Sequence, residues 1–116
     1  ECLGEAALSN EPAIKQVFIT GVTDDKVPVF ERILYLIRKR IEKRISDPDF
    51  YICSLSNSNI VYKGMLSSLQ LRQYYPDLTN NYFTSGLALV HSRFSTNTFP
   101  TWSLAQPFRL LCHSLA

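Results

Sequence analysis

The chain has 116 residues, of which 46% are hydrophobic and 19% charged, and its formal net charge is +2. These values are typical of one globular domain and do not favour binding to nucleic acid or to an anionic membrane. No apolar run approaches the roughly 18 residues that a membrane-spanning helix requires. The three cysteines, Cys2, Cys53 and Cys112, have no CxxC spacing. We therefore expect neither a disulfide framework nor a zinc site, and we expect a reducing, cytoplasmic compartment.

The first half of the chain predicts a short strand followed by one long helix. Residues 11–15 resemble the end of a helix, and residues 16–20 form a run rich in β-branched and aromatic side chains, which is typical of a strand. A helix is expected over 23–45, with Asp24 and Asp25 at its start and Pro28 in its first turn. Apolar residues recur at helical spacing along one face of it, at Phe30, Ile33, Leu34, Ile37, Ile41 and Ile45.

A basic cluster near the end of this predicted helix has two interpretations. It could bind nucleic acid, or it could be the solvated face of the helix. Cations near a helix C-terminus stabilise the helix dipole, Glu42 interrupts the cluster, and no aromatic or glycine-rich segment lies nearby to stack bases. We favour the solvated face and expect no nucleic-acid partner. The cluster comprises Arg38, Lys39, Arg40, Lys43 and Arg44.

The second half of the chain predicts a hairpin, a short helix and two further strands. Runs at 50–55 and 60–63 flank a polar turn, and Ser67 or Ser68 can cap a helix that ends before Pro76. Residues 87–95 and 108–113 are strand-like. This order of elements predicts a layered α/β or α+β domain with a largely antiparallel sheet. We expect three tyrosines to be packing residues: Tyr74, Tyr75 and Tyr82.

The strand predicted at 87–95 ends in charged and polar residues. Alternate side chains of a strand share a face, so His91 and Arg93 follow Leu87 and Leu89 on one side. Both faces begin with apolar residues, which indicates that both are covered. By residue type alone His91 is a satisfied core histidine rather than a base or a ligand.

Arg93 has a functional and a structural interpretation. A guanidinium at the end of a covered strand can bind a small carboxylate in an anion pocket, because its planar fork matches two oxygens. It can equally pair with an acid such as Asp49 or Asp77, or lie in solvent, and residue types alone favour this structural interpretation. We find no nucleophile, base and orienting acid that could form a catalytic set in this chain.

Three segments carry a resemblance to a known family. They are "FYICSLSNSNIVYKGML", "YYPDL" and "FTSGLALVHSRFSTNTFPTWSLAQPFRLL", and they resemble the class II glutamine amidotransferase domain of the glutamate synthase large subunit. The resemblance extends through "FERILYLIRKRIEK" and "IKQVFIT", and so covers nearly the whole chain. It implies an α+β fold of the N-terminal-nucleophile hydrolase type, with antiparallel sheets layered with helices. Residues 1–116 would form part of one such domain.

The resemblance also implies a substrate site and a reaction. Arg93 would bind the α-carboxylate of glutamine, while Phe94 and Thr96 would shape the pocket. In the family a cysteine at the mature N-terminus attacks the side-chain amide of glutamine, with its own α-amino group as the base. The parent protein would use the released ammonia to convert 2-oxoglutarate to glutamate, with FMN, an iron–sulfur cluster and NAD(P)H or ferredoxin. Its partners would be glutamine and the remainder of the glutamate synthase chain.

Two departures from the family pattern concern the catalytic groups. The chain starts "ECLGE", so Cys2 does not match the cysteine–glycine start of the family. After His113 come Ser114, Leu115 and Ala116, where the family places the asparagine and glycine of its oxyanion hole. We therefore expect a piece that lacks the N-terminal nucleophile strand and the C-terminal part, with no catalytic residue, no cofactor and no activity alone. The alternative is a non-enzymatic α/β interaction module in which "HSRFST" is merely structural.

Overall fold

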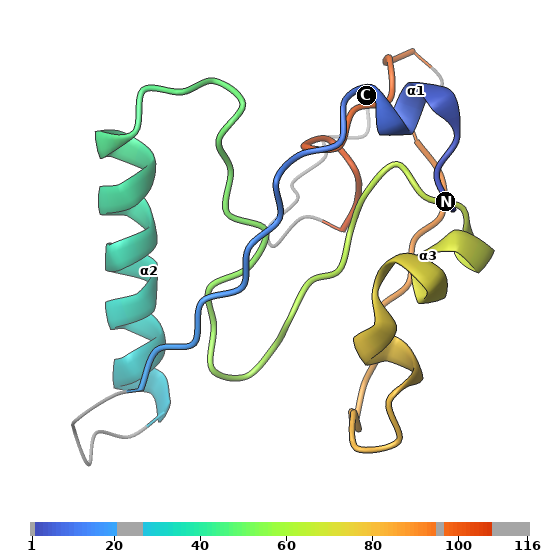
Figure 1. The fold of residues 1–116 in the computed structure, drawn as a ribbon. Coiled ribbons are helices and arrows are strands. Elements are labelled where there is room, and N and C mark those ends of the chain that lie inside the picture. The colour runs from blue at the N-terminus through green and yellow to red at the C-terminus, as the bar shows by residue number, and fades with distance from the viewer. Residues whose placement is uncertain (1, 21–26, 95–96, 108–116) are drawn as a thin grey trace, which may run out of the picture. The chain divides into compact units, whose positions relative to one another are not determined.

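The computed structural model describes residues 2–20, 27–94 and 97–107 (Figure 1). The chain divides into two compact units. Unit 1 comprises Glu1–Pro12 and Tyr62–Ala116, and unit 2 comprises Ala13–Val61. The helices of the described residues are α1 (Glu5–Leu8), α2 (Val27–Arg44), α3 (Ser68–Tyr74) and the 3-10 helix η1 (Pro76–Thr79). Helix α2 belongs to unit 2 and the other three to unit 1.

Helix α2 confirms the long helix expected from the sequence. It runs over 18 residues from Val27 to Arg44. Pro28 is its second residue, a position at which the missing N–H costs no intrahelical hydrogen bond. Leu34, only 3% exposed, is the buried residue of this helix. The acidic residues expected at its start, Asp24 and Asp25, lie outside the described residues.

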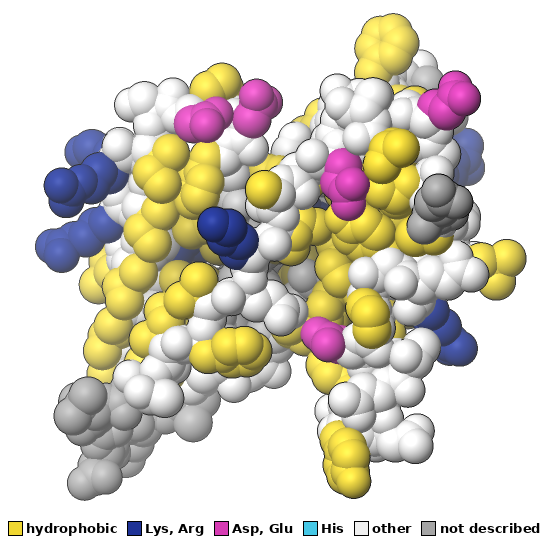
Figure 2. Space-filling model, in the orientation of Figure 1, with side chains coloured by type: hydrophobic (Ala, Val, Ile, Leu, Met, Phe, Trp, Pro, Cys, Tyr) yellow, Lys and Arg dark blue, Asp and Glu magenta, His cyan; other side chains and the backbone are white. Residues whose placement is uncertain are grey.

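The rest of the predicted apolar face of α2 is only partly covered. Phe30, Ile37 and Ile41 are half-buried, whereas Ile33 and Ile45 are exposed. Figure 2 shows apolar side chains open to view along this helix, with basic side chains beside them. Neither α2 nor any other helix in the described part of the chain is both long and apolar enough to cross a membrane.

The polar turn predicted at 56–59 is held against α2 by a single carboxylate. The Glu31 side chain accepts hydrogen bonds from the Ser56 hydroxyl and from the Asn57 backbone N–H, both at 2.7 Å. The Ser56 hydroxyl in turn accepts from the Ser58 N–H at 3.1 Å, which closes the turn locally. The polar segment is therefore fixed to the helix of its own unit, but it joins no paired strands, so the predicted hairpin is absent from the described residues.

Helix α3 of unit 1 begins and ends where the sequence predicts. The Ser67 hydroxyl accepts from the Gln70 N–H at 3.4 Å, and the Gln70 side-chain oxygen accepts from the Ser67 N–H at 2.8 Å. This reciprocal capping box satisfies two backbone donors that have no partner within the helix. Pro76 follows the helix and opens η1. The Gln70 amide also donates to the Cys2 carbonyl at 2.5 Å, which ties the start of the chain to α3.

Aromatic rings form the core of unit 1. Trp102 is 4% exposed, and its indole N–H donates to the backbone carbonyl of Ala7 in α1 at 3.0 Å. Its ring lies 5.4 Å from that of Tyr74, measured between centroids, and Tyr74 in turn lies 4.9 Å from Tyr75. Tyr62 extends the cluster at 4.8 Å from Tyr75. The predicted packing role of Tyr74 and Tyr75 is confirmed.

None of the predicted strands is present among the described residues. The segments 16–20, 50–55, 60–63 and 87–94 have neither helical nor ladder hydrogen bonds. The N–H and C=O groups of a strand must pair with a neighbouring strand, and no segment of the described chain supplies that ladder. The strand predicted at 108–113 lies outside the described residues.

Two smaller predictions, one about a helix end at residues 11–15 and one about Tyr82, are wrong. The helix expected to end within 11–15 lies earlier, at α1, where Ala7 is buried. Tyr82, expected to pack, is exposed. Whether a side chain is buried depends on contacts with distant parts of the chain, which a local sequence pattern does not encode.

Candidate functional site

The segment 87–94 is exposed, contrary to the expectation that both of its faces are covered. Leu87 is 86% exposed and Leu89 is 81% exposed, and Val90 is similarly open. Alternation of side chains decides which residues share a face but not whether a partner covers that face. Covering these leucines requires a neighbouring strand or layer, and the described residues provide none.

Arg93 forms no ion pair among the described residues. It is exposed, and no ion pair joins it to Asp49 or Asp77, so of the two structural alternatives the ion pair is wrong for this part of the chain and the side chain in solvent agrees with its exposure. Asp77 instead accepts a hydrogen bond from the Tyr62 hydroxyl at 2.7 Å. His91 is also exposed, with its Nε2 against the backbone carbonyl of Arg93, so it is not a core histidine. An uncompensated guanidinium in an accessible position is what an anion-binding site requires.

A small hollow lies beside Arg93 within unit 1. Its walls come from three stretches of the chain, namely Gly64 with Leu66, residues 91–94, and Ala105 with Gln106. Its volume is about 20 Å³, which is room for one water-sized group. The hollow can therefore receive the polar end of a small molecule, while the rest of that molecule would lie outside it.

Of the three residues predicted to bind substrate, two line this hollow. Arg93 and Phe94 belong to the same wall, and Phe94 is half-buried. Thr96 lies outside the described residues. The sequence therefore placed two of its three candidates beside a concave surface, although that surface is formed without the strand from which they were expected to project.

The other two walls of the hollow are joined by the core of unit 1. Gly64 faces the indole of Trp102 so closely that a Cβ at this position would lie 2.4 Å from Cζ3 of the ring. Lys63, the preceding residue, is 7% exposed and donates from Nζ to the Ser103 carbonyl at 2.7 Å. These contacts fix residues 63–64 against residues 102–103, directly next to the stretches that line the hollow.

Tyr74 supports this core through its protonated hydroxyl group. Its hydroxyl donates to the Glu11 carboxylate at 2.5 Å. Burial, together with the hydrogen bond to Glu11, raises the pKa of Tyr74 far above its usual range. Tyr74 therefore acts as a structural donor beside Trp102 and supplies no acid or base chemistry near neutral pH.

Nothing in the described residues forms a metal centre, since no group of three or more His, Cys, Asp or Glu side chains comes together there. Cys2 and Cys53 are half-buried and form no disulfide with one another, and neither lines the hollow beside Arg93. Cys112 lies outside the described residues. Among the described residues, the hollow is thus lined by an exposed arginine and by no cysteine.

Comparison with known proteins identifies the family. Residues 1–114 match the family described as Glutamine amidotransferases class-II. The chain belongs to this family. No solved structure matches it.

The curated relatives of this class II amidotransferase chain are glutamate synthases. It is 52% identical over 118 residues to the NADH glutamate synthase of Saccharomyces cerevisiae, covering 97% of this chain and 6% of that protein. It is 49% identical over 120 residues to the NADPH glutamate synthase large chain of Azospirillum brasilense, covering 98% of this chain and 8% of that protein. With the chloroplastic ferredoxin-dependent glutamate synthase 2 of Arabidopsis thaliana the identity is 48% over 116 residues, covering 97% of this chain and 7% of that protein. The chain thus spans under a tenth of the length of these relatives.

Several residues that line the hollow beside Arg93 were not predicted from the sequence. Gly64, Leu66 and Ala105 line the hollow, yet none of them is a residue type that indicates binding. Lys63 follows the apolar and aromatic run "IVY" and precedes a glycine, but this setting does not predict burial, because a lysine is rarely buried unless its charge is paired. Its partner, the carbonyl of a residue 40 positions later, could not be read from that pattern.

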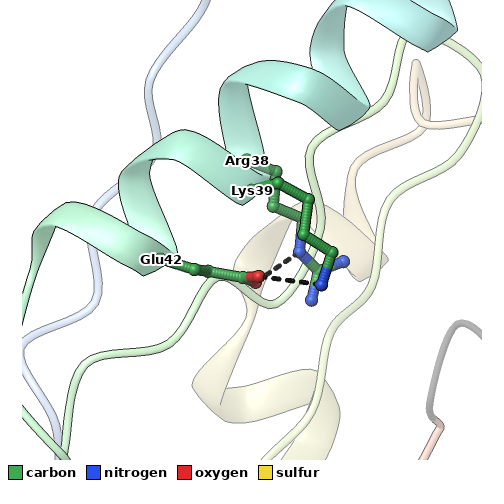
Figure 3. A network of polar contacts seen from close by, with 3 residues as sticks. All are labelled: Arg38, Lys39 and Glu42. Atoms are coloured by element: carbon green, nitrogen blue, oxygen red, sulfur yellow. Dashed lines mark hydrogen bonds and ion pairs between the residues drawn. The ribbon is translucent and has the colours of Figure 1, made fainter.

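The basic cluster on α2 of this amidotransferase chain is a solvated helix face, as predicted. Glu42 accepts from Nε of Arg38 at 2.7 Å and from Nζ of Lys39 at 3.3 Å (Figure 3). Arg40, Lys43 and Arg44 are exposed. Two of the five cations are therefore partly neutralised within the helix, which weakens the case for a nucleic-acid surface.

The ion pairs of Glu42 make the stability of α2 depend on pH. The hydrogen bond from Arg38 lowers the pKa of the Glu42 carboxyl below its ordinary value. A carboxyl whose pKa is lower in the folded state stabilises the fold above its unfolded-state pKa, and this contribution disappears as the pH falls through the folded-state pKa.

We therefore expect Glu42→Gln to lower the free energy of unfolding by about 0.5 kcal/mol near neutral pH and to have a smaller effect near pH 3. Urea unfolding followed by circular dichroism at the two pH values measures this difference. Asp49→Asn, a change at an exposed acid with no ion pair among the described residues, is the matched control. An equal cost of Glu42→Gln at both pH values would contradict the assignment.

Proposed function

We propose that this chain is part of the glutaminase domain of a glutamate synthase. In that role it contributes to hydrolysis of the glutamine side-chain amide to glutamate and ammonia, and the ammonia serves to convert 2-oxoglutarate to glutamate. The observation that carries the proposal is the match of residues 1–114 to the class II glutamine amidotransferases, together with 48–52% identity to glutamate synthases from three organisms.

The role proposed for Arg93 is to bind the α-carboxylate of glutamine. Its guanidinium is exposed, has no carboxylate partner among the described residues, and borders a hollow with room for one water-sized group. A planar fork of N–H donors can hold both carboxylate oxygens at once, which fixes the orientation of the amino acid. Phe94 and Thr96 would then shape the pocket around the bound substrate.

The proposed fold is the N-terminal-nucleophile hydrolase fold, with antiparallel sheets layered with helices. Residues 1–116 would form one part of a single domain of this kind, without its nucleophile strand and its C-terminal part. The exposed leucines at 87 and 89 support this proposal, because strands added from elsewhere in the parent would cover them.

The proposed reaction requires a nucleophile that the described site does not contain. In this family a cysteine thiol at the mature N-terminus attacks the amide carbon, ammonia leaves, and water releases glutamate from the resulting thioester. Neither Cys2 nor Cys53 lines the hollow beside Arg93, so we assign the nucleophile to another part of the parent chain. This segment would bind and orient glutamine.

The cofactors that the family resemblance implies for the parent do not fit the described residues. A cluster of cysteines able to hold an iron–sulfur centre is not found among them. We propose that FMN, the iron–sulfur cluster and the NAD(P)H or ferredoxin site belong to other regions of the parent. The relatives are named for NADH, NADPH and ferredoxin, so the electron donor varies among proteins that share this segment.

Ammonia release from glutamine tests the proposed function. The 116-residue chain should release no ammonia above the buffer background, and Cys2→Ala should change nothing, whereas the longer parent chain should release ammonia. Turnover by the 116-residue chain that Cys2→Ala abolishes would contradict our assignment of the nucleophile. A parent chain that binds glutamine and leaves it intact would contradict the function itself.

A further inference from the structure

A buried lysine directly precedes Gly64, one of the residues that line the hollow beside Arg93. Lys63 is the buried charged residue of the described chain, at 7% exposure. Placing an ammonium group in the interior costs free energy unless its N–H donors find acceptors. Its Nζ donates to the Ser103 carbonyl at 2.7 Å, a short charge-assisted hydrogen bond between segments 40 residues apart.

The backbone around Lys63 is fixed from two further directions. The Tyr75 hydroxyl donates to the Lys63 carbonyl at 2.9 Å, which holds the residue against the end of α3. The next residue, Gly64, lies in contact with the indole of Trp102, where even a methyl group would not fit. Lys63 and Gly64 thus hold the short segment at Trp102 and Ser103 by one polar and one apolar contact.

These contacts join two walls of the hollow. One wall consists of Gly64 and Leu66, and the other of Ala105 and Gln106, which follow Ser103 by two and three residues. Movement of the Ser103 carbonyl would carry Ala105 and Gln106 with it, and so change the distance between these walls and Arg93. The Lys63 side chain itself does not line the hollow.

We propose that Lys63 is a positioning residue of the glutamine site, whose buried ammonium holds the Ser103 carbonyl and thereby sets the wall formed by Ala105 and Gln106. The proposal rests on the proposed function of this chain as a glutamine-binding segment. A neutral donor would make a weaker hydrogen bond, and an apolar side chain would leave the Ser103 carbonyl without this partner. The site would then bind glutamine less well while the chemistry at the amide stayed the same.

The test uses Lys63→Met in the longer parent chain, with glutaminase kinetics as the measurement. We expect the KM for glutamine to rise about tenfold with kcat within about twofold, because a small displacement of the wall weakens binding and leaves the reacting groups in place. Lys63→Arg, which keeps a cation and N–H donors, should restore the KM to within about threefold of the parent value. Lys15→Met removes an exposed lysine and is the matched control.

Each outcome of the test bears on the proposal. An unchanged KM in Lys63→Met, or a KM that Lys63→Arg does not restore, would overturn it. If Lys63→Met does not fold, Lys63→Gln takes its place, since its amide is too short to reach the Ser103 carbonyl. A KM raised in Lys63→Gln supports the proposal, and failure of both variants to fold would show a purely structural role and overturn it.

Arg93→Gln separates this proposal from the proposed function. If Arg93→Gln raises the KM and Lys63→Met does not, only the positioning role of Lys63 fails. If neither Arg93→Gln nor Lys63→Met affects glutamine binding, the site beside Arg93 is not the glutamine site and the proposed role of this hollow fails as well.

Discussion

Replacing Arg93 with glutamine should raise the glutamine KM of the parent enzyme about 100-fold, a loss of about 3 kcal/mol of binding free energy. The guanidinium is exposed, unpaired among the described residues and placed on the wall of a small hollow, so a bound carboxylate would be its principal partner. Removing it leaves that carboxylate without a charged donor in a partly enclosed site. Steady-state kinetics of ammonia release measures the effect, with kcat changed far less than KM.

Two comparisons make the Arg93 prediction specific to the α-carboxylate. Arg93→Lys keeps the charge and loses the bidentate geometry, so it should raise the KM by only about tenfold. Arg72→Gln, at an exposed arginine in the last turn of α3, should leave the KM unchanged. For glutaminamide, in which an amide replaces the α-carboxylate, Arg93→Gln should have little further effect. An equal loss with both substrates would contradict direct binding of the carboxylate.

Trp102→Ala should lower the free energy of unfolding of unit 1 by about 3–5 kcal/mol. The indole is 4% exposed, packs near Tyr74 and Gly64, and donates to the Ala7 carbonyl at 3.0 Å. The substitution leaves a cavity and an unsatisfied carbonyl at the centre of the unit. A loss of this size is a large part of the roughly 5–15 kcal/mol that stabilises a typical domain, so we expect unit 1 to unfold at low denaturant.

Denaturant unfolding followed by circular dichroism measures this effect. Phe99→Ala is the matched control, because Phe99 is also a large aromatic residue but is exposed, and we expect a change within about 0.5 kcal/mol. Trp102→Phe, which keeps a ring and loses the N–H donor, should have an intermediate cost of about 1–3 kcal/mol. A Trp102→Ala variant as stable as Phe99→Ala would contradict the central packing role of the indole.

The parts of the fold that could be predicted are those whose hydrogen bonds are local. Helix α2 follows from apolar spacing and a proline in its first turn, and α3 follows from the Ser67–Gln70 capping box, whose partners are three residues apart. The polar turn at 56–59 is likewise closed by neighbouring serines. Each of these elements is determined by residues within a few positions of one another.

The strand predictions failed because a strand forms only when a segment distant in the sequence pairs with it. Residues 87–94 have the composition of a buried strand, and yet the described chain provides neither a ladder nor a covering layer for them. The candidate site shows the same difference between features that local sequence predicts and features that depend on distant contacts. Arg93 and Phe94 were found by residue type and family resemblance, whereas Lys63 and Trp102 became significant only through contacts 40 and 95 residues away along the chain.

The most direct test of this account is a structure of the longer parent chain with glutamine bound. The account predicts that two N–H groups of the Arg93 guanidinium lie about 2.7–3.0 Å from the two α-carboxylate oxygens. Ala105 and Gln106 should also contact the ligand. A glutamine whose α-carboxylate is held by other residues, with Arg93 directed into solvent, would contradict it.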